Sequence, residues 1–150
     1  IEFNVRLGDP ETQALVLSDP SDWLSHMARQ AGVKGIEAPA PRSHAETVLA
    51  VTMAAQGYPY EKPAADQHAV LSSAFFQSEP PIFAASVQQK AGALTTGSGR
   101  VITVTGCGTN HGDARRSAYS KVQEIAQIWP SAVWRSDIGQ TIAEESGDHN

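Results

Sequence analysis

The sequence predicts an α/β protein of the α+β kind: a strand and a helix, followed by a small domain with a mainly antiparallel sheet and one long helix. Three observations favour this fold class. Residues 1–7 alternate polar and apolar side chains, residues 47–105 contain apolar, β-branched runs between turns, and residues 114–129 carry one apolar stripe at helical spacing. With 150 residues, 41% hydrophobic and 18% charged, the chain can bury one ordinary core, or a small core and a piece of another.

The first forty residues are expected to form one strand and two short helices. After the strand, Asp9 can cap a helix that runs from about Pro10 to Leu17, because proline suits the first helical position. A break at residues 18–22 precedes a second apolar set at helical spacing, namely Trp23, Leu24, Met27 and Ala31. Residues 32–41 are rich in Gly, Pro and Ala and resemble a linker, so we place the domain boundary between residues 40 and 41.

The second region, residues 41–150, is expected to contain the sheet and the long helix. Its predicted strands are Thr47–Ala55, Val70–Phe76, Ile82–Val87, Arg100–Thr105 and a last short one, Ala132–Arg135. A glycine-containing loop after Thr105 leads to the helix, whose apolar stripe is Ala114, Ala118, Val122, Ile125 and Trp129. Pro130 ends that helix.

Charge and composition exclude several classes of function. The net charge is −5 and the basic residues are scattered, so no basic stripe is available for nucleic acid. No apolar run approaches the roughly 20 residues that span a bilayer. The single cysteine, Cys107, can form neither an internal disulfide nor a thiolate zinc site. We therefore expect a soluble, cytoplasmic protein, and we expect the sequence to be incomplete, since it opens at Ile1 without methionine.

The candidate chemistry lies in the first strand. Because alternate residues of a strand share a face, Glu2, Asn4 and Arg6 are expected on the exposed side. The opposite side, with Phe3, Val5 and Leu7, is expected to be buried. A carboxylate and an amide oxygen two residues apart can both bind one magnesium ion, which takes its remaining ligands from water and phosphates. Arg6 adds a fork of donors, and the following helix directs its free N–H groups towards the same region. The spacing alone also fits an ordinary exposed strand edge.

The literal sequence adds a resemblance to a known family. Residues 1–13, IEFNVRLGDPETQ, resemble the magnesium-binding segment of the phosphoribosylamine–glycine ligases, which are ATP-grasp enzymes. Residues 99–106, GRVITVTG, followed by Ala114-Arg115, Ala118-Tyr119 and residues 135–139, RSDIG, are similar to the C-terminal domain of that family in order and spacing. Residues 51–62 resemble its apolar strand and Gly-Tyr-Pro turn more loosely.

The resemblance implies a function and a set of site residues. In this family glycine and ATP form a glycyl phosphate, which the amine of 5-phosphoribosylamine attacks to give glycinamide ribonucleotide in purine biosynthesis. Carried over by position, Glu2 and Asn4 would bind Mg²⁺ or Mn²⁺, and Arg6 would stabilise charge on the transferred group. The turn beside the phosphates and substrate would be Gly8, Asp9, Pro10 and Glu11. Residues 1–40 would be the end of an ATP-grasp domain, and residues 41–150 the family's C-terminal domain.

The resemblance also predicts limits on activity. The nucleotide-binding lobes of the family are absent from this sequence, so the chain alone is expected to be inactive and to need the N-terminal part of the enzyme as its partner. Two stretches depart from the family pattern: residues 58–62 are compressed, and Ala84–Val87 replaces a His-Ala-Gly-Thr stretch. A non-catalytic binding or structural module derived from the enzyme therefore remains the alternative.

Other motifs predict less. Gly106-x-Gly108-x-x-x-Gly112 lies between a strand and a helix as in dinucleotide-binding proteins, but no acidic residue follows at the required distance, so a connecting loop is favoured. The five histidines have no metal-ligand spacing. Cys107 and His111 are close in sequence, which is no evidence of a catalytic pair, and we expect Cys107 to be a dispensable thiol in that loop.

Overall fold

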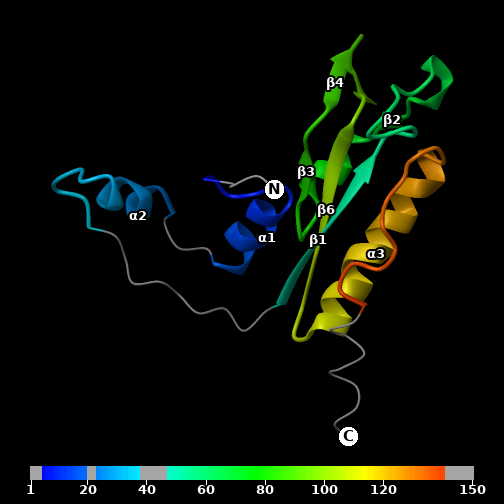
Figure 1. The fold of residues 1–150 in the computed structure, drawn as a ribbon. Helices are drawn as coiled ribbons and strands as arrows, with labels where there is room; N and C mark the ends of the chain where they lie inside the picture. Colours follow the sequence, from blue (N-terminus) through cyan, green and yellow to red (C-terminus); the bar gives the residue numbers. More distant parts are fainter. Residues whose placement is uncertain (1–4, 20–22, 38–46, 141–150) are drawn as a thin grey trace, which may run out of the picture.

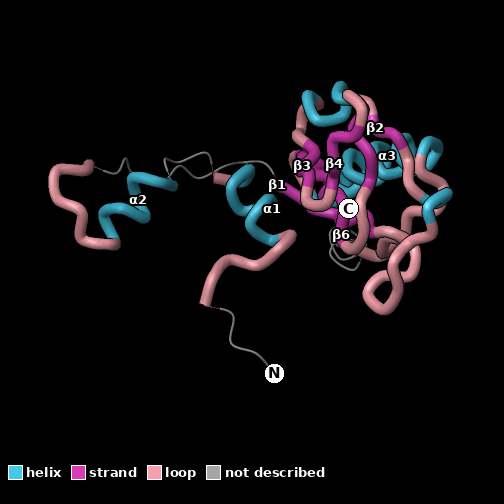
Figure 2. The backbone as a smooth tube through the Cα atoms, turned by 90° about the horizontal axis from the view of Figure 1, so that it is seen from above, coloured by secondary structure: helices cyan, strands magenta, loops and turns pink. Residues whose placement is uncertain are grey.

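A computed structural model of the chain describes residues 5–19, 23–37 and 47–140. It combines helices with two small antiparallel sheets, in the order α1, α2, β1 to β6 and α3, with two short 3₁₀ segments between strands. The first sheet has the strand order β1-β6-β3, and α3 covers one of its faces while α1 lies on the other side (Figures 1 and 2). The predicted α+β class is confirmed, although the strands form two sheets where we expected one.

The centre of the first sheet is β6, Arg100–Gly108. It pairs antiparallel with β1, Thr47–Ala54, from Thr47 opposite Gly108 to Met53 opposite Ile102. On its other edge lies β3, Ile82–Ala84. Because β6 has neighbours on both edges and helices on both sides, its residues from Val101 to Gly106 are all buried. This explains why its sequence is almost continuously apolar or β-branched.

The second sheet joins β2, Val70–Leu71, to β5, Ala93–Thr96, and β5 to β4, Val87–Lys90. A two-residue turn connects β4 to β5, and both of its residues have positive φ, 49° at Ala91 and 82° at Gly92. Such a turn matches the twist of a hairpin. Neither β5 nor the end of β4 was predicted from the sequence.

The long helix α3, His111–Ile128, provides the other half of the core. Asn110 caps it, with its side-chain oxygen accepting from the Asp113 amide at 2.9 Å. The predicted stripe is confirmed: Ala114, Ala118, Val122, Ile125 and Trp129 are all buried. They pack against Val51, Met53, Val101 and Val104 of the first sheet in one hydrophobic cluster.

Three strand predictions in this region are wrong in part. Of Val70–Phe76, only β2 is extended, because the Ser72 hydroxyl accepts from the Ala74 amide and starts a 3₁₀ turn over Ser73–Gln77. Ile82–Val87 is split between the two sheets at Ala85. The predicted strand Ala132–Arg135 is reduced to one bridge, in which Val133 pairs with Ala54.

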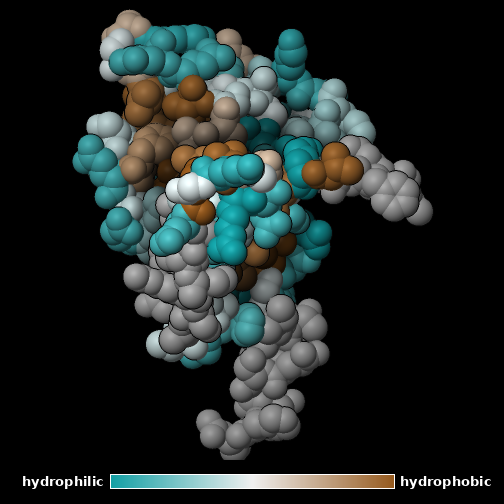
Figure 3. Space-filling view, turned by 90° about the vertical axis from the view of Figure 1, so that its left-hand side faces the viewer, coloured by the Kyte–Doolittle hydropathy of each residue, from teal (hydrophilic) through white to brown (hydrophobic). Residues whose placement is uncertain are grey.

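The N-terminal segment, by which we mean residues 5–19 and 23–37, contains α1, Glu11–Ser18, and α2, Trp23–Gln30. Both predicted helices are confirmed, and neither contains a buried residue. Large apolar side chains are exposed on both, including Leu15, Val16, Leu24 and Met27. Figure 3 views the side of the molecule on which these helices lie, and apolar patches alternate there with polar surface.

The predicted first strand is not seen where it can be checked. Residues 1–4 lie outside the described residues, and Val5 to Leu7 are not in a strand. Val5 is 97% exposed and Leu7 43%, so the buried face expected for them is wrong within this chain. The split into residues 1–40 and 41–150 stays a prediction. In the described ranges, no helix is long and apolar enough to cross a membrane.

Candidate functional site

The turn before α1 is held by bonds within the N-terminal segment. The Gly8 amide donates to Oε1 of Glu11 at 2.9 Å, and the Thr12 amide donates to the Gly8 carbonyl at 3.0 Å. The Thr12 hydroxyl donates to the same carbonyl at 2.5 Å. These bonds fix the turn from Gly8 to Glu11, which the family resemblance assigned to phosphate and substrate.

Asp9 does not cap α1, and that prediction is wrong. Pro10 occupies the cap position, and no side chain caps the helix. The Asp9 carboxylate turns elsewhere: Oδ1 accepts from Nε2 of Gln13 at 2.9 Å, and Oδ2 lies 3.3 Å from a guanidinium nitrogen of Arg100. The other terminal nitrogen of Arg100 donates to the Asp9 carbonyl at 2.7 Å. Arg100, the first residue of β6, therefore joins the second region of the chain to the turn.

A cavity of about 350 Å³ lies at this junction, lined by Arg6, Gly8, Asp9, Pro10, Glu11 and Arg100. Five of the predicted site residues thus lie together. Two guanidinium groups line the cavity together with the carboxylates of Asp9 and Glu11, which accept bonds from the protein. Arg6 donates to the Leu7 carbonyl and Arg100 contacts Asp9, and the N–H groups that remain on both are suitable donors for an anion such as a phosphate. Arg100 was not predicted as a site residue, because residues 99–106 indicated a strand and a family match but no contact with the turn.

The predicted metal ligands Glu2 and Asn4 lie outside the described residues. Among the residues that the structure does describe, no group of three or more His, Cys, Asp or Glu side chains could hold a metal ion. The metal prediction therefore stays a prediction.

The matched residues 135–139 are attached to α3. The Tyr119 hydroxyl donates to the Arg135 carbonyl at 2.7 Å and accepts from the Ile138 amide at 3.1 Å. Arg115 lies over the Tyr119 ring and donates to the Ser136 carbonyl at 2.7 Å. A hydrogen bond from Arg135 lowers the pKa of the exposed Asp137 carboxyl. These contacts attach the segment that follows α3 to that helix.

Gly106 and Gly108 belong to β6, not to a loop, and they face α3. A Cβ atom on Gly106 would lie 2.3 Å from the Ala118 amide nitrogen and 2.4 Å from the Ala114 carbonyl oxygen. A Cβ atom on Gly108 would lie 2.5 Å from the Ala114 amide nitrogen. These glycines allow the strand and the helix to approach closely, so their spacing is explained by packing and not by a dinucleotide.

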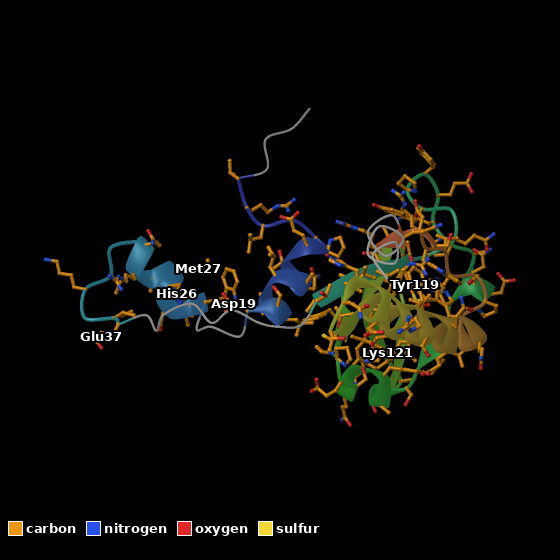
Figure 4. The ribbon with its side chains drawn as sticks, turned by 90° about the horizontal axis from the view of Figure 1, so that it is seen from below. Asp19, His26, Met27, Glu37, Tyr119 and Lys121 are labelled. Carbon is orange, nitrogen blue, oxygen red and sulfur yellow. The ribbon has the colours of Figure 1, made fainter. Side chains whose placement is uncertain are left out.

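Cys107 also lies in β6, so its predicted loop position is wrong. Cys107 interacts electrostatically with Lys121 of α3, whose amine donates a hydrogen bond to the Pro80 carbonyl. Burial lowers the pKa of the Lys121 amine, while the charges of Cys107, Glu79 and Glu124 act in the opposite direction. Figure 4 shows Lys121 and Tyr119 on the domain, far from Asp19, His26, Met27 and Glu37 of the N-terminal segment.

The two divergent stretches have structural roles. Residues 57–61 form a tight turn in which the Tyr60 and Glu61 amides donate to the Gly57 carbonyl. Tyr58 lines a second, mostly apolar cavity of about 330 Å³ with Arg100 and Trp134. In the other stretch, the amides of Ala85 and Ser86 both donate to the Val101 carbonyl, which marks the point where the chain passes from β3 to β4.

Comparison with known proteins agrees with this architecture. Residues 48–141 match the family model described as phosphoribosylglycinamide synthetase, C domain. Over 150 residues the chain is 36% identical to the phosphoribosylamine–glycine ligase of Pseudomonas putida, covering 99% of this chain and 34% of that protein. The corresponding enzyme of Rhizobium meliloti is also 36% identical, with coverage of 97% and 34%. The chain therefore spans about a third of the length of these relatives.

The chain also resembles a solved structure in its fold. The crystal structure of phosphoribosylamine–glycine ligase from Thermotoga maritima superposes with a TM-score of 0.67 at 32% identity, covering 92% of this chain and 32% of that one. The fold of helices and antiparallel sheets is thus shared with a protein of the family that the sequence resembled.

Proposed function

The chain belongs to the phosphoribosylglycinamide synthetase family through its C domain, and from that premise we propose that it forms part of an ATP- and magnesium-dependent ligase. The ligase joins glycine to 5-phosphoribosylamine and gives glycinamide ribonucleotide in purine biosynthesis. The chain covers 34% of the P. putida relative. Under this proposal, the nucleotide-binding lobes lie in the part of the ligase that corresponds to the remaining two-thirds of that relative. The 150 residues alone are inactive under this proposal.

The reaction needs a site for negative charge. A carboxylate oxygen of glycine attacks the terminal phosphorus of ATP, and ADP leaves. The amine of phosphoribosylamine then attacks the carbonyl carbon of glycyl phosphate, phosphate leaves, and the nitrogen loses a proton. Arg6 binds the phosphate oxygens through its planar fork, and the turn of Gly8, Asp9, Pro10 and Glu11 lies beside the phosphates and the substrate.

Magnesium, or manganese, has its ligands at Glu2 and Asn4 in this proposal. One carboxylate and one amide oxygen suit a hard cation that keeps other positions for water and phosphate oxygens. When bound, the ion screens the phosphate charge. The side chains of Asp9 and Glu11 are engaged with Arg100, Gln13 and the Gly8 amide, which leaves the metal to the residues before Arg6.

One observation supports the proposal most directly. The cavity of about 350 Å³ is lined by Arg6 and the four turn residues, which are the residues that the family resemblance places beside the phosphates and the substrate. These five residues are near neighbours in sequence, so the informative member of the lining is Arg100, which the fold brings to them from a distant strand.

A chimera tests the proposal. The chain would replace the matching third of the P. putida ligase, with which it is 36% identical. The purified chimera should form glycinamide ribonucleotide from glycine, ATP and phosphoribosylamine, and should restore growth without purines to a strain that lacks the ligase. The matched control is the same chimera with Arg6→Ala. A folded chimera that forms no product would refute the proposal and favour the non-catalytic module.

A further inference from the structure

We propose that Arg100 is a positioning residue, which holds the turn from Gly8 to Glu11 in place and so shapes the anion cavity. This inference rests on the proposed function for its meaning in catalysis, but its structural part can be tested without any activity. Arg100 is separated from the turn by most of the chain and lines the same cavity.

The anchor for Arg100 is rigid. Arg100 begins β6, and the next residues, Val101 and Ile102, are 0% and 1% exposed. The pairing with β1 skips Val101, since Met53 lies opposite Ile102 and Ala54 opposite Arg100. A bulge of this kind redirects a side chain, and the amides of Ala85 and Ser86 fix it by donating to the Val101 carbonyl.

The turn is closed by its own hydrogen bonds, but no apolar packing within its own segment holds it against the rest of the chain. Gly8 is the one buried position within the described part of residues 5–37, and α1 buries no residue. Arg100 adds a charged donor 2.7 Å from the Asp9 carbonyl and an ion pair of 3.3 Å with the Asp9 carboxylate. The ion pair is weak, because the side chains are 42% and 38% exposed. The bond to the backbone carbonyl is the stronger contact and does not depend on the Asp9 side chain.

The geometry has a consequence for ligand binding. Arg6 and the turn residues face the cavity from the N-terminal segment, and Arg100 faces it from the domain. Arg100 thus sets the distance between the two halves of the anion site. Loss of Arg100 should weaken the binding of a phosphate-bearing substrate more than it slows the chemical step.

Amide hydrogen exchange, measured by NMR on the 150-residue chain, tests the structural part. Arg100→Gln should speed exchange of the Gly8 and Thr12 amides by about three- to tenfold, because their bonds define the turn. Arg100→Lys should have a smaller effect, since it keeps the charge and one donor. The control Arg116→Gln removes an exposed arginine paired with Asp113 and should leave both amides unchanged.

Unchanged exchange at Gly8 and Thr12 in a folded Arg100→Gln chain would overturn the inference. If that variant does not fold, the same decision rests on Arg100→Lys, in which unaltered exchange at both amides counts against a positioning role.

The chimeric ligase supplies the second measurement. Arg100→Gln should raise KM for phosphoribosylamine several-fold with a smaller change in kcat, and Arg100→Lys should restore part of the affinity. A fall in kcat at constant KM would contradict the inference. If the parent chimera is inactive, the proposed function fails, while the exchange rates still decide whether Arg100 positions the turn.

Discussion

The two described parts of this chain use their apolar residues in opposite ways. Residues 47–140 bury them in one cluster between α3 and the sheets. The N-terminal segment leaves them exposed or half-buried, and its two helices contain no buried residue. The residues of the proposed site nevertheless lie mostly on the second kind of structure. In this chain, a site with no core of its own is therefore held by contacts with a domain that has one, through residues such as Arg100.

The two tryptophans provide the strongest test of this difference. Trp129 is 1% exposed and donates to the Gln67 carbonyl, whereas Trp23 donates to the Asp19 carbonyl on a helix with no buried residue. Trp129→Ala should cost about 3–5 kcal/mol of stability, and Trp23→Ala close to none. Urea unfolding followed by circular dichroism measures both. Equal losses would mean that the N-terminal segment contributes to the same cooperative core.

The approach of β6 to α3 gives the second test. Gly106→Ala should destabilise the chain by about 1–3 kcal/mol, because the new methyl group would collide with the backbone of Ala114 and Ala118. Gly112→Ala, near the start of α3, should change stability by less than about 1 kcal/mol, because the gain in helix propensity is opposed by a contact of 3.2 Å between the new Cβ and the capping oxygen of Asn110. Thermal unfolding compares the two variants. A tolerated Gly106→Ala would be incompatible with close strand–helix packing.

The third test examines the proposed site, most of whose residues belong to the N-terminal part of the chain. In the chimeric ligase, Glu2→Gln keeps size but removes the charge that is proposed to hold the metal, so the magnesium concentration for half-maximal rate should rise on the order of tenfold. Excess magnesium should restore part of the rate. Arg6→Lys should lower turnover without moving the magnesium curve, since it loses the planar fork and keeps the charge. A Glu2→Gln chimera with the parent's magnesium curve would remove Glu2 from the metal site.

The smallest expected effect is a pH dependence of folding stability that arises from Lys121. Burial lowers the pKa of Lys121 below 10.5 in the folded state, so the unfolded chain binds more protons between the two values. Stability should therefore rise as pH increases through that window, and Lys121→Met should remove this rise. Cys107→Ser should leave the fold intact. In this variant the rise in stability should begin at a lower pH, because the charge of Cys107 raises the pKa of Lys121. Urea unfolding from neutral pH to 10.5 measures the difference between the chains.

Strong apolar patterns were sufficient to predict β1, the first six residues of β6, and α3. The predicted stripe of α3 is buried, and local preference in these elements agrees with the tertiary fold. The predictions failed where a single polar group or a change of sheet decided the outcome. Ser72 starts a 3₁₀ turn inside an apolar run, and the two amides at Ala85 and Ser86 divide another run between sheets. A hydrophobic pattern with a period of two or 3.6 residues contains no information about such a turn or such a change of sheet.

The candidate site was predictable only in its linear part. Arg6 and the turn residues are contiguous, so the family motif identified them together. Arg100 reaches them through the fold, since its position depends on the β1–β6 register and on the bulge at Val101. A strand prediction for residues 100–105 places Arg100 at a strand end but gives no information about which distant segment it contacts.

The pairing of β1 with β6 also determines when this domain can form. All of β2 to β5 lies between these two partners along the chain, so the first sheet closes only after its most distant segments meet. Such non-local pairing loses loop entropy before it gains packing, and it slows folding. During synthesis, β1 has no partner until β6 has left the ribosome, and α3 has no sheet to cover before then. The domain is consequently a late-folding unit, in which β1 has no strand partner for most of its translation.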